Sequence, residues 1–363
     1  MTSVRDLVVH DDDLVVATFG RSFWILDDVT PLRQLDSRMA AADSWLFRPQ
    51  ITYRVRPGND QGTPVPMDEA LARNPRDGVM LDYYIKENSA LPVQLEILDS
   101  EGKLVRRFAS DDKLSRTNPD DVPFQYDWVS NPQPLPADAG MHRFVWDLHY
   151  PLSKGVRSSF FGPSGPWAVP GNYTVKLTVG GKSSTQPLTI KLDPRVKTPQ
   201  DALVRQFDLA SKLAVRLGEV STALQQAGDL RKQIEERKKE SSGNPELSKT
   251  LQGLQEKMEA AAQPDSDDDF MMFGLAVPGK EHEPLPKVAA AITGLVMIVE
   301  SADVAPTTDA AMASERWEEA AVESLARWTA FQREDLANVN TALEKAKLKT
   351  LIISPSEGTP TAH

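Results

Sequence analysis

The chain has 363 residues, of which 40% are apolar and 26% charged, a composition typical of a protein that folds into about two or three globular domains. Its net charge of −11 disfavours nucleic-acid binding and docking on anionic membranes, since both require a basic surface. It has no cysteine, which excludes disulfides, thiolate catalysis and cysteine-based zinc sites.

The N-terminal segment, residues 1–30, predicts a small apolar hairpin. Residues 14–19 and 22–26 are short apolar runs, and Gly20 between them favours a turn. Neither run alternates, so we expect both faces of the hairpin to be buried. An isolated two-stranded hairpin is marginal in water, so this segment is expected to need neighbours.

Residues 31–77 are rich in Pro, Gly, Asp and Asn, and they predict a surface connector in which 45–47 and 51–55 add short strands. Residues 78–194 predict a β-sandwich, because several short strands are separated by regular turns. Within it, Phe144, Trp146, Leu148 and Tyr150 alternate with polar residues, which indicates one buried strand face.

Residues 199–348 predict an antiparallel helical bundle. Apolar residues recur at spacings of three and four from 210 to 234 and again from 247 to 258, and a very apolar helix is expected over 288–299. Pro306 and Thr307 predict the start of the last long helix. Residues 349–363 are expected to form a disordered tail. The fold class is therefore multidomain, β plus α.

The charged and histidine clusters offer weak metal sites at most. His142 and His149 would point to opposite faces of one continuous strand, so they are poor co-ligands and a structural role is expected. Asp265, Asp267, Asp268 and Asp269 offer carboxylates for calcium, but the glycine and glutamate of an EF-hand are missing. A solvated loop between helices is the favoured interpretation, with no metal.

Two aromatic or apolar groups lie in expected loops. Phe160, Phe161 and Trp167 suit either a carbohydrate-binding surface or the anchoring of a long loop, and anchoring is favoured. The second group comprises Phe270, Met271, Met272 and Phe273. It either packs into the bundle, which is favoured, or contacts a partner.

Catalytic and cofactor motifs are absent from the sequence. It has no nucleophile elbow, no phosphate-binding loop and no dinucleotide-binding glycine pattern. Carboxylates are abundant, but no pair is marked as an acid–base pair by its setting. We therefore expect no cofactor and no reaction that this chain performs alone.

Several stretches together resemble one family. Residues 13–28 read DLVVATFGRSFWILDD and 30–35 read TPLRQL; farther along, 143–148 read RFVWDL, 170–175 PGNYTV, 186–188 QPL and 193–195 DPR. The chain resembles the C-terminal region of bacterial sortilin-like BNR-repeat β-propeller proteins, which are often labelled glycosyl hydrolases or exo-sialidase-like. The resemblance implies a partial propeller blade at 1–30 and an immunoglobulin-like sandwich of the FlgD type, followed by a helical tail.

The resemblance also sets expectations for function. About half a four-stranded blade is predicted, so a catalytic site that converges from several blades cannot form, and no catalytic residue carries over. The chain is expected to be a non-catalytic accessory or interaction region; the alternative is part of a sialidase-like glycoside hydrolase whose catalytic propeller is missing. The expected partner is the missing propeller or another protein chain, with carbohydrate as a further candidate and no nucleic acid or membrane insertion. The resemblance implies export to the periplasm or cell exterior, whereas residues 1–6 do not form a signal peptide, so a cytoplasmic location is expected if Met1 is the true start.

Overall fold

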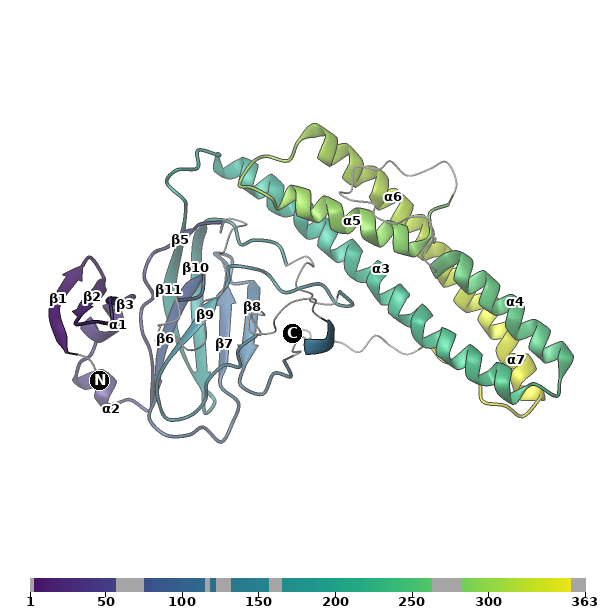
Figure 1. Ribbon diagram of the computed structural model, residues 1–363, viewed down its shortest axis with the longest axis horizontal. Coiled ribbons are helices and arrows are strands. Elements are labelled where there is room, and N and C mark those ends of the chain that lie inside the picture. Colours follow the sequence, from purple (N-terminus) through teal and green to yellow (C-terminus); the bar gives the residue numbers. More distant parts are fainter. Residues whose placement is uncertain are drawn as a thin grey trace. The chain divides into compact units, whose positions relative to one another are not determined.

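The computed structural model describes residues 3–56, 75–114, 118–121, 132–156, 165–262 and 282–353. The protein is mixed α and β, with several sheets and a set of long helices (Figure 1). The described residues fall into two compact units. The first runs to Tyr150 and resumes from Ala168 to Lys197, and the second takes the described residues between these two stretches and those after Lys197. The first unit holds all the sheets, and the second holds the long helices together with the segment 151–167.

The first unit begins with a separate three-stranded antiparallel sheet, which we call the N-terminal sheet. Its strand order is β1-β2-β3, with β1 Val4–His10, β2 Asp13–Thr18 and β3 Phe23–Leu26. The prediction of two strands was incomplete, because β1 also pairs with β2 along its length. A tight turn at Asp11, with a φ of 52°, joins them.

The expectation that both faces of this hairpin are buried is wrong. On β3 the side chains of Phe23 and Ile25 are 72% and 56% exposed, and every residue of β2 is only half-buried; every residue of the additional strand β1 is exposed. Within the described part of the chain, no element packs over these side chains. Their apolar character is therefore not explained by the core of this chain.

Two further sheets form the larger part of the first unit, which we call the two-sheet region. One sheet has five strands in the order β5-β11-β10-β7-β8, and the other has three in the order β4-β6-β9. The strands are β4 Ser44–Leu46, β5 Thr52–Arg54, β6 Val79–Ile85, β7 Gln94–Leu98, β8 Leu104–Ala109, β9 Gly140–Trp146, β10 Gly171–Val179 and β11 Lys182–Leu192. All pairs are antiparallel except β5 with β11.

Alternating side chains from the two sheets meet in a shared core. Phe108 of β8 lies 4.6 Å from Phe144 of β9, measured between ring centroids. Trp146 of β9 meets Tyr173 of β10 edge-on, with ring centroids 6.0 Å apart. The sheets therefore pack with these faces in contact, as alternation along the strands requires.

The predicted stripe from Phe144 to Tyr150 is only partly strand. β9 ends at Trp146, and Leu148 has a φ of 62°, which a continuing strand does not permit. Leu148 is nevertheless buried. The predicted connector contributes β4 and β5 to the sheets, and the short helices α1 Thr30–Arg33 and α2 Ser37–Ala41 lie at its start. Farther along the chain, a 3-10 turn lies at Pro119–Asp121.

The second unit, which we call the helical region, contains α3 Gln200–Glu240, α4 Pro245–Ala262, α5 Leu285–Val299, α6 Thr308–Phe331 and α7 Ala337–Lys345. A π-helical turn, Gln332–Leu336, joins α6 to α7. Thr307 caps α6 as its sequence predicts, because its hydroxyl accepts a hydrogen bond from the amide of Ala310 at 3.1 Å. Order extends past residue 348: Leu351 is buried, and it exchanges backbone hydrogen bonds with the Asn340 side chain.

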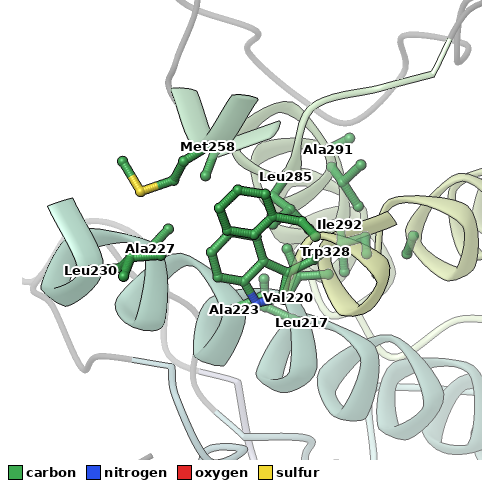
Figure 2. Close-up of a cluster of buried hydrophobic side chains, with 14 of the residues drawn as sticks. Leu217, Val220, Ala223, Ala227, Leu230, Met258, Leu285, Ala291, Ile292 and Trp328 are labelled. Carbon is green, nitrogen blue, oxygen red and sulfur yellow. The ribbon is translucent and has the colours of Figure 1, made fainter. Parts of the chain in front are cut away.

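The apolar seam predicted over 210–234 forms the core of the helical region. Figure 2 shows side chains of α3, α4, α5 and α6 converging around Trp328. The indole nitrogen of Trp328 donates to the Gln226 side chain at 3.1 Å, so its one polar atom is satisfied within the core. The labelled neighbours are Leu217, Val220, Ala223, Ala227, Leu230, Met258, Leu285, Ala291 and Ile292.

Residues 153–155, which the sequence places within the sandwich range, pack on α3 instead. They cross the helix where Gly155 meets Gly218: a side chain at 155 would come within 2.4 Å of the Thr222 hydroxyl. The Gln225 side chain donates to the Gly155 carbonyl at 2.8 Å. Glycine at both positions allows this close approach of two backbones.

We predict that Trp146→Ala lowers the free energy of unfolding of the first unit by about 3–5 kcal/mol. Trp146 has no exposed surface, and its indole donates to the His149 carbonyl at 3.0 Å. Urea unfolding followed by circular dichroism measures the loss. The matched control is Tyr53→Ala, at a side chain 49% exposed, which should change stability by about 0.5 kcal/mol or less.

A second prediction compares two glycines of the same helix. In Gly218→Ala the new Cβ would lie 2.7 Å from the Ser153 Cβ and 2.8 Å from the Lys154 carbonyl oxygen, so the helical region should lose about 1–3 kcal/mol. Gly228→Ala meets nothing within 4 Å and should add about 0.5–1 kcal/mol through helix propensity. Thermal unfolding of both variants checks the opposite signs, and equal effects would contradict the close crossing.

Candidate interaction surface

The N-terminal sheet carries the largest group of exposed apolar side chains on neighbouring elements in the described chain. Soluble proteins scatter such residues singly, and a contiguous apolar group marks an interaction site. Here they follow two strands and the turn beside them: Val4, Leu7, Val8 and Val9 on β1, then Phe19, Phe23, Ile25 and Leu26. The N-terminal sheet is therefore the candidate interaction surface of the described chain.

The two edges of the N-terminal sheet differ in how they are protected. The β1 edge carries the charged residues Arg5 and Asp6, and its pairing with β2 shifts register between Val4 and Asp6. Charges and bulges are devices that discourage another strand from pairing. β3 reads FWIL, without a charge, a proline or a shift. Among the described residues no strand pairs with its outer side, so β3 is the edge that favours strand addition.

Most of the candidate residues predicted from the sequence lie outside the part of the chain that the structure describes, so their predicted roles stay untested. Phe160 and Phe161 lie outside the described residues, as do the segments 265–269 and 270–273 with their aspartates and apolar side chains. Trp167 is described: it is half-buried, and its backbone amide donates to the Glu300 carboxylate at 3.4 Å. Trp167 therefore packs within the helical region.

The two histidines have separate local roles. A ring nitrogen of His142 lies 2.7 Å from the Asp138 carbonyl oxygen, and the ring packs 5.3 Å from that of Tyr83. Nδ1 of His149 lies 2.7 Å from the carbonyl oxygen of Asp147. Among the described residues, no group of three His, Cys, Asp or Glu side chains is arranged to hold a metal ion.

His149 belongs to a charged group at one end of the two-sheet region. Burial lowers the pKa of His149; the carboxylate of Asp147 opposes this, while Arg56 and Arg106 add to it. Burial also lowers the pKa of Arg106, whose guanidinium lies over the Phe108 ring. The hydrogen bonds between Asp147 and His149 lie within the turn after β9.

Neither a family model nor a curated protein matches the chain. None of the helices that the structure describes is both long and apolar enough to cross a membrane. The N-terminal sheet is therefore a candidate interaction surface because of its strand order and its exposed apolar side chains alone.

Sequence reasoning missed β1, which carries half of this surface. The signal was present in residues 4–10, VRDLVVH, where Leu7-Val8-Val9 form an apolar run. The charges of Arg5 and Asp6 hid the pattern, because they belong to an edge strand that faces solvent. The turn residues 11–13 were the second signal, since three aspartates favour a tight turn.

We predict that the first unit becomes less stable as the pH falls below 6.5, and that His149→Gln weakens this dependence. The pKa of His149 is lowered from 6.5 in the folded state, so its contribution is present above 6.5 and is lost as the pH falls through the folded-state pKa. Urea unfolding at about pH 7.5 and about pH 5.5 measures the difference. An identical pH dependence in wild type and variant would contradict the assignment.

Proposed function

We propose that the chain is a non-catalytic C-terminal accessory region of an exported BNR-repeat β-propeller protein, and that it acts as a scaffold or binding module. The observation that carries the proposal is the N-terminal sheet, which has three strands, exposed apolar side chains and an unprotected β3 edge. A propeller blade has about four strands, and its side chains pack against neighbouring blades. A three-stranded sheet whose exposed side chains are apolar fits an incomplete blade, for which a partner would supply the remaining strand and the neighbouring blades.

The rest of the chain has a role in this proposal as well. We infer that the two-sheet region is an immunoglobulin-like sandwich, which is supported by its two sheets with aromatic side chains meeting between them. The helical region is proposed to be an antiparallel bundle, which is supported by the contacts of α3 with α4, α5 and α6. These modules would present or stabilise the propeller rather than carry out a reaction.

The partner is proposed to be the propeller itself, and its missing strand is proposed to pair along β3. Two physical terms favour this mode. A new strand would satisfy the outward-facing amides and carbonyls of β3, and a neighbouring blade would cover Phe23 and Ile25. Apolar area removed from water contributes about 25 cal/mol per Å², so covering these side chains stabilises the complex.

The reading frame upstream of Met1 provides the first part of the test. It is expected to encode propeller repeats with Ser-x-Asp-x-Gly-x-Thr-Trp boxes and a signal peptide. That propeller segment and the present chain are then produced as separate polypeptides and tested for association by affinity capture and light scattering. An upstream frame without such repeats would contradict the proposal.

We predict that Phe23→Lys combined with Ile25→Lys reduces capture of the propeller segment at least about tenfold, because two charges would be buried without partners. Both positions are exposed in this chain, so the fold of the remainder should be unchanged. The matched control is Val215→Lys on α3, a position 60% exposed and outside the N-terminal sheet, which should leave capture unchanged. Equal capture of the double variant and the wild type would show that the sheet is not the interface.

A further inference from the structure

The junction between the N-terminal sheet and the two-sheet region centres on one side chain, Arg143 of β9. Its Nη1 donates to the carbonyl oxygen of Asp27 at 2.6 Å, and its Nη2 donates to that of Asp28 at 2.8 Å. These two carbonyls belong to the chain as it leaves β3. One guanidinium therefore holds the exit of the N-terminal sheet at two successive peptide groups.

The other side of the guanidinium is fixed by the two-sheet region. Nε donates to one carboxylate oxygen of Asp82 at 2.9 Å, and Nη2 donates to the other at 3.1 Å. Asp82 lies directly opposite Arg143 in the pairing of β6 with β9, and its side chain is only 8% exposed. A bidentate pair of this kind fixes the plane and direction of the guanidinium.

The Asp28 side chain adds a second anchor at the same junction. Its Oδ1 accepts hydrogen bonds from the amide and hydroxyl of Thr30 and, at 2.7 Å, from the Gln50 side chain just before β5. The amide of Asp28 donates to the Asp13 carboxylate at 2.9 Å. Asp28 has a φ of 51°, a left-handed conformation that is retained because these bonds outweigh its cost.

We propose that Arg143 is a positioning residue that fixes the N-terminal sheet on the two-sheet region, so that β3 is presented in one orientation to whatever pairs with it. A flexible connector would instead let the sheet sample many orientations. Arg143 has this role in the free chain, whatever the identity of the partner.

The geometry explains why this position requires arginine. Four donations from one planar group reach a carboxylate and two carbonyls that lie in different directions. Lysine has a single ammonium group on a flexible stem, so it cannot satisfy the carboxylate and both carbonyls in this arrangement. The substitution Arg143→Lys, which keeps the charge, is therefore expected to behave like Arg143→Leu.

The test measures orientation directly in the full chain. The chain has no cysteine, so His10→Cys and Ser184→Cys introduce two unique, exposed sites for spin labels, one at the end of β1 and one on β11. Pulsed electron paramagnetic resonance then gives the distribution of distances between them. A single narrow distribution is expected without further substitution. Arg143→Leu and Arg143→Lys should each widen it at least about twofold.

The matched control is Arg107→Leu. Arg107 also lies on a strand of the two-sheet region and pairs with an aspartate, Asp112, and its side chain is 25% exposed, close to the 30% of Arg143. This substitution should leave the distribution unchanged. Equal widths in wild type and Arg143→Leu, or equal widening by Arg107→Leu, would overturn the proposal.

If Arg143→Leu prevents folding because Asp82 is left unpaired, Arg143→Leu combined with Asp82→Leu decides the question. The double substitution removes both charges of the pair, so no buried carboxylate is left without a partner. A widened distribution in the double variant supports Arg143 as the positioning residue, and an unchanged one overturns the proposal. Because no partner is added, failure here is distinguishable from failure of capture by the propeller segment.

Discussion

The ion pair between Arg143 and Asp82 is the interaction on which the placement of the N-terminal sheet depends. Burial raises the pKa of Asp82, and this effect exceeds the opposing influence of the adjacent guanidinium. A buried ion pair is weak evidence for stability, because the cost of removing the two charges from water offsets their attraction. What this pair supplies is direction, because a guanidinium held by Asp82 can reach the carbonyls of Asp27 and Asp28.

This division between stability and position extends through the first unit. The two-sheet region derives its stability from apolar side chains that are removed from water, among them the fully buried Trp146. The N-terminal sheet has few such contacts, since the side chains of β1 and β3 remain largely exposed. A sheet of this kind is expected to be near the lower limit of stability alone. Its hydrogen bonds to the two-sheet region hold it in place while its apolar side chains remain available.

The sequence predicted most of the elements that depend on local patterns, and it missed the contacts between residues far apart in the chain. The helical seam over 210–234 and the Thr307 cap follow from spacing and capping rules, and the structure contains both. The third strand, β1, was missed because its charges obscure an edge strand. The Arg143 junction joins residues more than a hundred positions apart, which a single sequence does not reveal. The faces of β3 were predicted to be buried because an apolar strand has the same sequence pattern whether residues of this chain or of another chain pack over it.

Apolar strands with both faces exposed are a liability for a protein that works alone, because an unprotected edge recruits other chains. The protection here is one-sided: β1 carries charges and a register shift, whereas the FWIL strand β3 carries neither. An edge that merely tolerates solvent would be expected to be protected on both sides. The asymmetry supports the proposal that β3 pairs with another chain, for which the junction at Arg143 would hold this edge in a defined place.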